Sequence, residues 1–346
     1  MSETPPQFPL TPQTLLMAHG LTQVIISLHQ TGILQQLEQQ AQDAATLAKA
    51  AQLSVTAIQQ CLPIAEKLGL VRQDDTRKYY LTDAAHCLLP DHPGTIIPAL
   101  EHAALGYPAW GQLTHSLRTG TSAFPEAYGA DIYDYLAIHP TDNTAFRQHM
   151  ANSTQAWLNP AVGRYPFSGH VIDLGGNQGD FSVLLLQHYP ELHSTVFDLP
   201  ETVAPADQVL STAGVAERGQ IVAGSFFAPE QIPTHGSHYL FSRVLLNWSD
   251  AQVVQILQNC RQAMPADSKL VILEFVQTTQ ADLGADIGNL NLLVMFGART
   301  RTQSDFADLV SQAGFHSLRW ISASDTLPLY YLEAKPMTDH ELPANT

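Results

Sequence analysis

A glycine-rich turn between a strand-like run and a helix-like run is the strongest chemical signal in the sequence. Within "VIDLGGNQGDFSVLLLQHYP", Gly175, Gly176 and Gly179 let the backbone bend tightly and approach a ligand, because no Cβ stands in the way. The next strand-like run, "STVFDLP", ends in Asp198, 23 positions after Gly175. A carboxylate at that place accepts hydrogen bonds from a ribose diol, so the pattern predicts a nucleoside-containing ligand.

Asp173 and the order of the glycines bear on the type of nucleoside. A nicotinamide dinucleotide and an adenosyl sulfonium compound both suit a glycine-rich turn. The turn reads Gly-Gly-Asn-Gln-Gly, however, and lacks the second glycine of a G-x-G-x-x-G dinucleotide turn. Asp173, just before the glycines, can orient loop amides or meet an ammonium group, which only an amino-acid-bearing ligand has. Both details favour the adenosyl sulfonium compound.

A second stretch, "RVLLNWSD" at 243–250, begins apolar like a buried strand and becomes polar around a tryptophan. Open α/β sheets place their chemistry at such strand ends. The two residues before Trp248 are Leu246 and Asn247, and neither is a useful acid or base at neutral pH. The stretch therefore leaves open whether a reaction runs at this point.

The elements around these motifs follow from hydrophobic periodicity. From about residue 168, strand-like runs alternate with amphipathic helical segments, which predicts a doubly wound, mostly parallel sheet. Residues 106–165 are helical and rich in aromatic side chains. Their apolar residues belong either to a core or to the wall of a ligand pocket, and they include Tyr133, Phe146, Met150 and Trp157.

The first 105 residues have the pattern of several helices and one hairpin. Two helices meet near Leu53, the second ends at Gly69, and "LVRQDDTRKYYLT" predicts two short strands. Two helices followed by a hairpin indicate a winged helix. The second helix, 54–68, carries one Lys, one Glu and no Arg, which disfavours DNA binding. We expect a packing or dimerisation module.

Composition excludes several classes of protein. A chain of 346 residues favours two domains. A net charge of −16, with 16 basic against 32 acidic residues, argues against a nucleic-acid partner. The sequence has no apolar run near the roughly 20 residues of a membrane span and no signal-peptide pattern, so we expect a cytoplasmic protein without a membrane partner. Neither the three cysteines nor the 15 histidines have metal-ligand spacing, so no metal site is predicted.

Six segments between residues 173 and 315 together resemble one enzyme family, the S-adenosylmethionine-dependent small-molecule O-methyltransferases of the plant caffeic-acid type and their bacterial natural-product relatives. The segments are "DLGGNQGDFSVLLLQHYP", "FDLPETV", "GSFF", "SRVLLNWSDAQVVQILQNCRQAM", "ILEFV" and "GARTRTQSDFADLVSQAGF". The resemblance implies S-adenosyl-L-methionine as the cofactor, S-adenosyl-L-homocysteine as its product, and a homodimer that acts on a small-molecule acceptor.

The same resemblance implies an α/β fold, a Rossmann-like class I methyltransferase domain with an N-terminal α-helical winged-helix dimerisation domain. The implied divisions are a dimerisation domain at 1–105, a helical linker that contributes to the acceptor pocket at 106–165, the cofactor-binding catalytic domain at 166–336 and a tail at 337–346.

The cofactor site is implied residue by residue. Asp198 would bind the ribose hydroxyls, and the paired glycines would lie along the methionine moiety. In place of the family's Gly-Asp-Phe stretch, whose Asp reaches the adenine amino group, this chain has a shorter and neutral Ser225. Trp248 belongs either beside the cofactor or in the core. The full implied set is Asp173, Gly175, Gly176, Asp198, Leu199, Ser225, Phe226, Arg243 and Trp248.

The chain departs from the family where its catalytic base is expected. The family's Leu-His-Asp-Trp stretch, whose His is the general base, has Leu246 in the His position here. Of the two acids that hold that His, Glu274 is present and Thr300 replaces the other. Our candidate catalytic residues are therefore Asn247 and Glu274, the latter as a base if burial raises its pKa or as a hydrogen-bond anchor. A base contributes roughly 10²–10⁴-fold, whereas alignment supplies about 7–11 kcal/mol, so methyl transfer remains the leading hypothesis.

The acceptor pocket is implied by the same resemblance. His149 is either a substitute base or an ordinary helix-surface histidine, and Met295 and Phe296 either contact an aromatic ring or belong to the core. The candidate acceptor residues are Phe146, His149, Met150, Leu246, Asn291, Met295 and Phe296. The alternative hypothesis is a member of the same fold that does not methylate, such as a hydroxylase, a decarboxylase or a pericyclic catalyst. A DNA-binding regulator is the third and least favoured.

Overall fold

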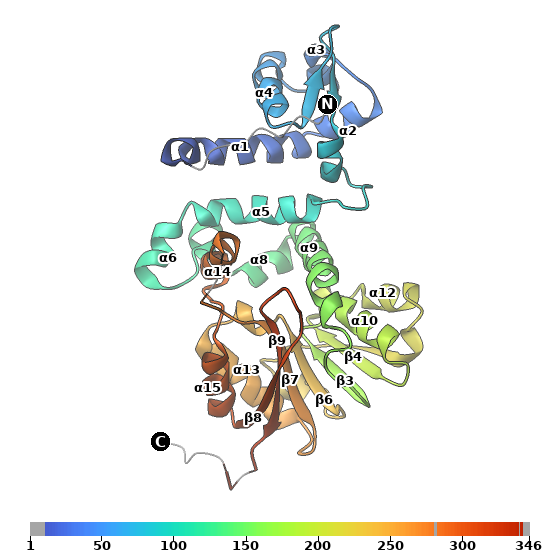
Figure 1. Ribbon diagram of the computed structural model, residues 1–346, viewed down its shortest axis with the longest axis vertical. Coiled ribbons are helices and arrows are strands. Elements are labelled where there is room, and N and C mark those ends of the chain that lie inside the picture. The colour runs from blue at the N-terminus through green and yellow to red at the C-terminus, as the bar shows by residue number, and fades with distance from the viewer. Residues whose placement is uncertain (1–10, 280–281, 339, 342–346) are drawn as a thin grey trace. The chain divides into compact units, whose positions relative to one another are not determined.

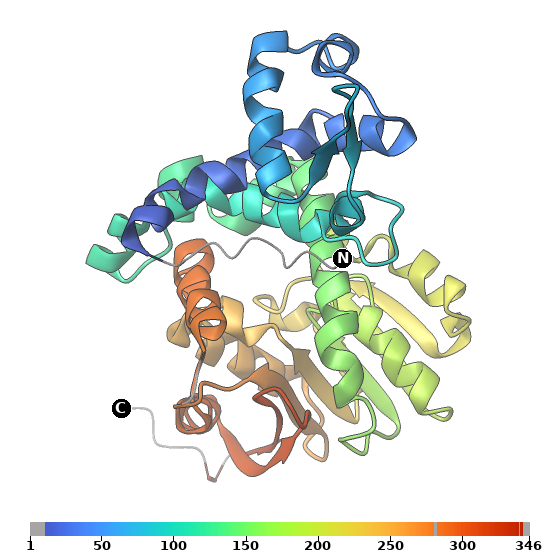
Figure 2. The ribbon, with the colours of Figure 1, turned by 45° about the horizontal axis from the view of Figure 1, so that its top comes forward.

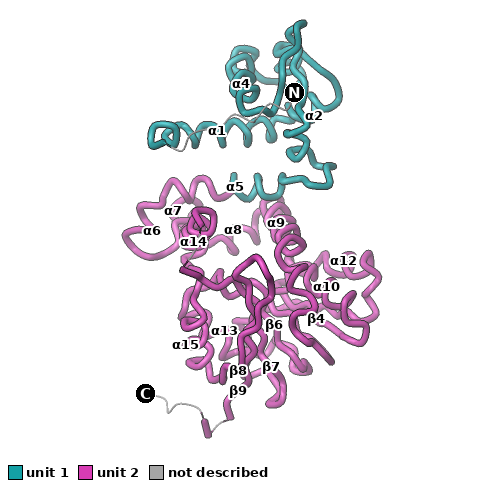
Figure 3. Tube along the Cα trace, viewed as in Figure 1, with its two compact units in different colours: residues 1–104 teal, residues 105–346 magenta. Residues whose placement is uncertain are grey.

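The computed structural model describes residues 11–279, 282–338 and 340–341. Part of the predicted tail, residues 339 and 342–346, lies outside the described residues, as do residues 1–10. The chain divides into two compact units, 1–104 and 105–346 (Figure 3). No helix in the described ranges is long and apolar enough to cross a membrane.

The first unit is a small helical domain with one hairpin. Asp43 and Ser54 cap the helices α3 and α4, because their side-chain oxygens accept hydrogen bonds from the first-turn N–H groups. Gly69 follows α4 with a φ of 75°, as the sequence predicts for the end of that helix. The elements are α1 Pro12–Gln30, α2 Ile33–Gln39, α3 Ala44–Ala50, α4 Val55–Lys67, the antiparallel strands β1 Val71–Gln73 and β2 Tyr79–Leu81, and η1 Asp83–Leu88.

A helical segment opens the second unit. The helix α5, Ile97–Trp110, crosses the boundary between the units, and four helices and a 3-10 turn follow it. They are α6 Leu113–Thr119, α7 Phe124–Tyr128, α8 Ile132–Ile138, α9 Pro140–Leu158 and η2 Asn159–Ala161. These helices pack with α14, Leu283–Phe296, around an apolar cluster that contains Phe124, Phe146 and Met295.

A seven-stranded sheet forms the rest of the second unit, in the order β5-β4-β3-β6-β7-β9-β8. The first five strands in this order pair in parallel, and β9 pairs antiparallel with both β7 and β8. The predicted α/β, mostly parallel, doubly wound sheet is confirmed, whereas the antiparallel final pair was not foreseen. The strands are β3 His170–Leu174, β4 His193–Asp198, β5 Gly219–Ala223, β6 His238–Ser242, β7 Lys269–Phe275, β8 Phe315–Ser322 and β9 Leu329–Pro336.

Helices cover both faces of this sheet, with α10 and α12 on one face and α13 and α15 on the other (Figure 1; Figure 2). Side chains alternate between the two faces, so Ile172 and Leu174 join one core cluster while Val171 joins the other. Burial on both faces explains why these strands read as nearly continuous apolar runs. The remaining elements are α10 Asp180–His188, α11 Pro200–Val203, α12 Ala206–Thr212, η3 Ala216–Arg218, η4 Pro229–Gln231, η5 Leu245–Asn247, α13 Asp250–Ala263, α14 Leu283–Phe296 and α15 Gln303–Gln312.

Candidate active site

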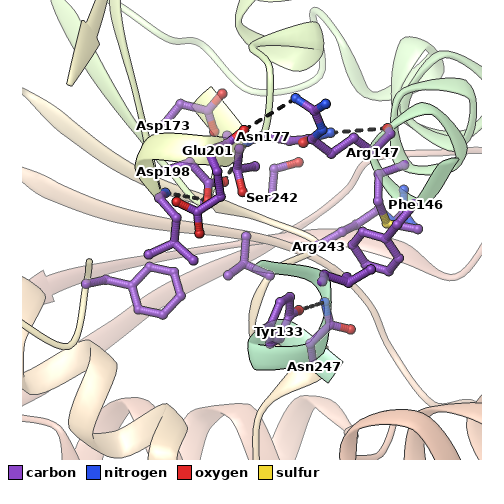
Figure 4. A pocket seen from close by; sticks show the side chains of 18 of the residues that line it. Tyr133, Phe146, Arg147, Asp173, Asn177, Asp198, Glu201, Ser242, Arg243 and Asn247 are labelled. Carbon is purple, nitrogen blue, oxygen red and sulfur yellow. Dashed lines mark hydrogen bonds between the residues drawn. The ribbon is translucent and has the colours of Figure 1, made fainter. Parts of the chain in front are cut away.

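A cavity lies at the carboxyl ends of β3, β4, β5 and β6, and residues of α8 and α9 also border it (Figure 4). This is the edge at which open parallel sheets bind their ligands. All nine predicted cofactor residues border the cavity, and two predicted acceptor residues on α9 and the predicted catalytic residue Asn247 join them. The predicted residues at the cavity are Asp173, Gly175, Gly176, Asp198, Leu199, Ser225, Phe226, Arg243, Trp248, Phe146, Met150 and Asn247.

The glycine-rich turn leaves no space for side chains. Gly175 has a φ of 75°, and a Cβ there would lie 2.7 Å from Cγ2 of Val244. A Cβ on Gly176 would lie 2.9 Å from Cγ of Asp173. The N–H of Gly175 donates to the carbonyl oxygen of Phe197 at 2.8 Å, which fixes the turn to the end of β4. Glycine is therefore required here for backbone conformation and for space.

Asp198 is held by the backbone at the end of β4. Its Oδ2 accepts from the N–H of Asn177 at 2.8 Å, and its Oδ1 accepts from the N–H of Leu199 at 2.7 Å. Burial raises the pKa of Asp198 to about 6, while these two hydrogen bonds lower it. The carboxylate borders the cavity with lone pairs still available to hydroxyl groups.

Asp173 is 1% exposed, and burial raises its pKa to about 7. Its Oδ2 accepts from the hydroxyl of Ser182 at 2.7 Å. Its Oδ1 is buried and has no hydrogen-bond partner among the described residues, and the same holds for Oδ2 of Asp180. Because Asp173 and Asp180 both border the cavity, their unpaired oxygen atoms are suited to pair with a cationic group of a ligand.

The stretch that the sequence presents as a strand end turns out to be a 3-10 turn. The strand β6 ends at Ser242, Arg243 has a φ of 57°, and η5 covers Leu245–Asn247. Arg301, only 1% exposed, donates to the carbonyl oxygens of Leu245 at 2.8 Å and Trp248 at 2.6 Å. The carbonyl oxygen of Leu245 also accepts from the N–H of Trp248 at 3.3 Å, and together these bonds pair the carbonyl groups after the end of β6 and set the position of Asn247 and Trp248.

Arg243 lies deep in the site. Its guanidinium carbon is 4.6 Å from the ring centre of Trp157, and its Nη1 donates to the hydroxyl of Ser153 at 3.2 Å. Burial lowers the pKa of Arg243 to about 10, and the nearby Glu274 opposes that shift. The Nε atom of Arg243 is buried without a hydrogen-bond partner in the part of the chain that the structure describes.

Glu274 is 1% exposed and does not border the cavity. Its Oε2 accepts from the N–H of Leu246 at 3.3 Å, and its Oε1 accepts from the N–H of Phe275 at 3.1 Å. Burial raises the pKa of Glu274 to about 7, while the charge of Arg243 lowers it. Both oxygens of this carboxyl therefore face the backbone, which is the geometry of a hydrogen-bond anchor.

Several aromatic side chains pack around Tyr133, which contacts Asn247. The ring of Tyr133 stacks on that of Trp248 at 5.3 Å and meets Phe146 edge-on at 6.5 Å and Phe296 at 6.0 Å. The Nδ2 of Asn247 donates to the hydroxyl oxygen of Tyr133 at 3.1 Å (Figure 4). The pKa of Tyr133 is raised well above its ordinary value, chiefly by burial, so its hydroxyl remains protonated at neutral pH.

The other predicted acceptor residues lie farther from this cavity. Asn291 accepts a hydrogen bond from the indole N–H of Trp110 at 2.9 Å, and Met295 is 1% exposed in the apolar cluster below α5. Leu246 and His149 are half-buried and do not border the cavity, and burial lowers the pKa of His149. Ser225, by contrast, is a predicted cofactor residue that borders the cavity, and its hydroxyl oxygen accepts from the N–H of Phe227 at 3.2 Å.

Residues 110–316 match the model of the O-methyltransferase domain. The chain belongs to this O-methyltransferase family. It is 33% identical over 281 residues to the O-demethylpuromycin-O-methyltransferase of Streptomyces alboniger. This match covers 78% of this chain and 74% of the relative. It is 32% identical over 275 residues to the phenazine O-methyltransferase of Lysobacter antibioticus, with 78% and 79% covered.

Solved structures of family members agree with the fold. An O-methyltransferase from neocarzinostatin biosynthesis, solved with S-adenosylmethionine and 2-hydroxy-5-methyl naphthoic acid, superimposes with a TM-score of 0.83. It is 25% identical in sequence, and the match covers 96% of this chain and 99% of that one. The expected class I methyltransferase fold is therefore confirmed.

Sequence reasoning missed three residues of this O-methyltransferase family member. Arg301 was noted only as part of a family motif. Its hydrogen bonds to η5 were missed, because the carbonyl partners lie more than 50 positions away in the sequence. Ser182 lay unremarked in the helix after the glycine-rich turn. Tyr133 was noted as an aromatic residue, and only its contact with Asn247 distinguishes it from the core.

Proposed function

We propose that this protein is an S-adenosylmethionine-dependent methyltransferase that acts on a small aromatic acceptor without a histidine base. The observation that carries the proposal is the cavity bordered by the glycine-rich turn, Asp173 and Asp198 at the carboxyl edge of the sheet. Family membership supports the reaction class. The relatives compared above are named for O-demethylpuromycin and phenazine, and the solved one holds a naphthoic acid, which supports an aromatic acceptor.

The residues present fit S-adenosylmethionine. The unpaired Oδ1 of Asp173 suits an α-ammonium group, and Asp198 suits the two ribose hydroxyls. The glycine turn supplies the close backbone approach that a Cβ would prevent. When bound, the cofactor supplies a methyl group on a positively charged sulfur. Leu199 and Phe226 would then flank the adenine, with Arg243 and Trp248 at the methionine end.

The acceptor hydroxyl is proposed to lose its proton without help from a strong base at η5. Leu246 has no titratable group, and its N–H is engaged by Glu274. Thr300 donates to Oδ1 of Asn289 from both its N–H and its hydroxyl, at 2.7 Å each, so it is committed to α14. Alignment of two bound reactants lowers the barrier by about 7–11 kcal/mol. This corresponds to more powers of ten in rate than the roughly 10²–10⁴-fold that a general base contributes.

Tyr133 and Asn247 are proposed to align the acceptor oxygen. The amide of Asn247 uses a lone pair of the Tyr133 oxygen, which leaves the hydroxyl hydrogen of Tyr133 free to donate elsewhere. Stacking on Trp248 fixes the ring and hence that direction. A hydrogen bond from a neutral phenol favours an anionic oxygen, so the preferred acceptor is a hydroxyl that is acidic enough to ionise by itself.

Transfer of a labelled methyl group tests the proposal directly. Aromatic hydroxyl compounds of increasing acidity are incubated with the full chain and methyl-labelled S-adenosylmethionine. Labelled product from the acidic members supports the proposal. If calorimetry detects binding of neither S-adenosylmethionine nor S-adenosylhomocysteine, the proposal is wrong.

A reaction other than methyl transfer is the second candidate. It is favoured by the absence of a titratable side chain at Leu246 and by the diversion of Thr300 to Asn289. The same labelled incubation separates the two, because a converted acceptor without label, in the presence of bound cofactor, supports the second candidate.

The residues 1–105 are proposed to form a homodimerisation domain. The first turns of α1 expose three apolar side chains in sequence, Leu15 at 53%, Leu16 at 75% and Met17 at 57%. Sedimentation of the full chain tests this, with Leu16→Asp expected to shift a dimer toward monomer. A monomeric wild-type chain would contradict it.

A further inference from the structure

Two serine hydroxyls and Asp173 form a buried chain of hydrogen bonds beneath the glycine-rich turn. Ser182 Oγ, on α10, lies 2.7 Å from Oδ2 of Asp173, on β3, and 2.8 Å from Oγ of Ser194, on β4. Both serines are fully buried. These hydrogen bonds therefore link the three elements β3, β4 and α10 at the base of the candidate cofactor site.

The number of hydrogens decides the direction of this chain. A serine hydroxyl has one hydrogen to donate. While Asp173 is ionised, Ser182 must spend its hydrogen on Oδ2, so Ser194 must donate to Ser182. The bond to an ionised carboxylate is roughly twice as strong as one between neutral groups, and the second hydroxyl polarises the first. The chain of serines consequently favours the charged form of Asp173.

The other charged groups that face Asp173 do the opposite or are engaged elsewhere. Asp198, at the end of β4, and Asp180, on α10, both disfavour its ionisation. The two guanidinium groups at the cavity, those of Arg147 and Arg243, donate to oxygen atoms of α11 and α9. Ser182 is thus the donor that offsets burial and like charge, while Oδ1 of Asp173, on a residue that borders the cavity, is buried without a hydrogen-bond partner among the described residues.

We propose that Ser182, supported by Ser194, is a positioning residue that favours the ionised form of Asp173 and aims its Oδ1 at the α-ammonium group of the cofactor. This inference rests on the proposed function. It makes ligand binding and the loss of the Asp173 proton coupled events. Because burial raises the pKa of Asp173 to about 7, binding near neutral pH should release a proton.

Calorimetry with S-adenosylhomocysteine measures this coupling without turnover. The full chain is titrated from about pH 6 to about pH 8, in buffers that differ in ionisation enthalpy. We expect wild-type affinity to rise with pH and binding to release protons. Ser182→Ala should move this profile up by roughly one pH unit and weaken binding at neutral pH roughly tenfold. Ser194→Ala should move the pH profile in the same direction and weaken binding at neutral pH roughly threefold.

A matched control separates positioning from general damage. Ser268 is a buried serine whose hydroxyl donates to the carbonyl oxygen of Pro265 at 2.6 Å, in a loop that does not border the cavity. Ser268→Ala should leave the pH profile unchanged even if it lowers the melting temperature.

A wild-type pH profile in Ser182→Ala would overturn the inference while leaving the proposed function intact. If Ser182→Ala does not fold, Ser194→Ala decides, since the shift must keep its sign. If the wild-type chain binds no S-adenosylhomocysteine, the proposed function fails and this inference fails with it.

Discussion

Asn247 donates a hydrogen bond of 3.1 Å from its side-chain amide to the hydroxyl oxygen of Tyr133. The two residues come from η5 and α8, and both border the cavity. Neither is a base at neutral pH, so the role that we propose for them is to hold an acceptor oxygen in line with the methyl group. The proposed chemistry therefore rests on position and on the acidity of the acceptor itself.

Removal of the Tyr133 hydroxyl should slow turnover. Tyr133→Phe keeps the ring that stacks on Trp248 and loses only the donor. We expect kcat to fall roughly tenfold, the value of one hydrogen bond to a charged oxygen, with S-adenosylhomocysteine affinity unchanged. Tyr135→Phe is the control, because the hydroxyl of Tyr135 donates to Asp142 and does not border the cavity. Full turnover in Tyr133→Phe would show that the phenol does not hold the acceptor.

Arg301 should be the main anchor of η5. Arg301→Met removes the donor to the carbonyl oxygen of Trp248, one of two donors to the buried carbonyl oxygen of Leu245, and the ion pair with Asp250, so the free energy of unfolding should fall by about 3 kcal/mol in chemical denaturation. Arg299→Met removes two ion pairs of a half-exposed arginine and should cost at most about 1 kcal/mol. Equal losses in the two variants would mean that the buried contacts of Arg301 carry no special weight.

Gly175 should be intolerant of a side chain for two separable reasons. Gly175→Ala adds left-handed strain of about 1–2 kcal/mol and a clash with Val244, so S-adenosylhomocysteine affinity should fall at least roughly tenfold. Adding Val244→Ala removes the clash and should restore part of the affinity. Gly214→Ala carries a similar strain at a φ of 71° in open space, and it should bind normally. Normal binding by Gly175→Ala would remove this turn from the site.

Stability should fall in mild acid through His170. Burial, and then the charges of His235 and His193, lower the pKa of His170 to about 4. The unfolded chain takes up this proton first, near the ordinary histidine pKa of about 6.5, so stability is at its full value above that pH and is lost as the pH falls toward 4. His170→Gln should flatten the pH dependence of denaturation, whereas His316→Gln, on the exposed edge strand, should not. An unchanged slope in His170→Gln would contradict the assignment.

Local sequence patterns predicted much of the fold and brought together the residues of the candidate cofactor site. The strands β3 to β7 and the glycine-rich turn were predictable because burial on both faces and backbone conformation act on neighbouring residues. The end of β6 at Ser242 was not, because the turn that follows depends on hydrogen bonds from distant Arg301. Met295 was open between an acceptor contact and the core, and periodicity could not show that it is buried in the apolar cluster close to Gly106. Long-range contacts decided the points that periodicity left open.

The pH dependence of kcat/KM across acceptors of different acidity tests the central claim most directly. Without a histidine base, the acidic limb of each profile should follow the hydroxyl pKa of the acceptor, because the enzyme selects the ionised form. The measurement uses one family of ring-substituted phenols with the wild-type chain. An acidic limb that stays at one pH for every acceptor would reveal a titrating base on the protein and would contradict the account.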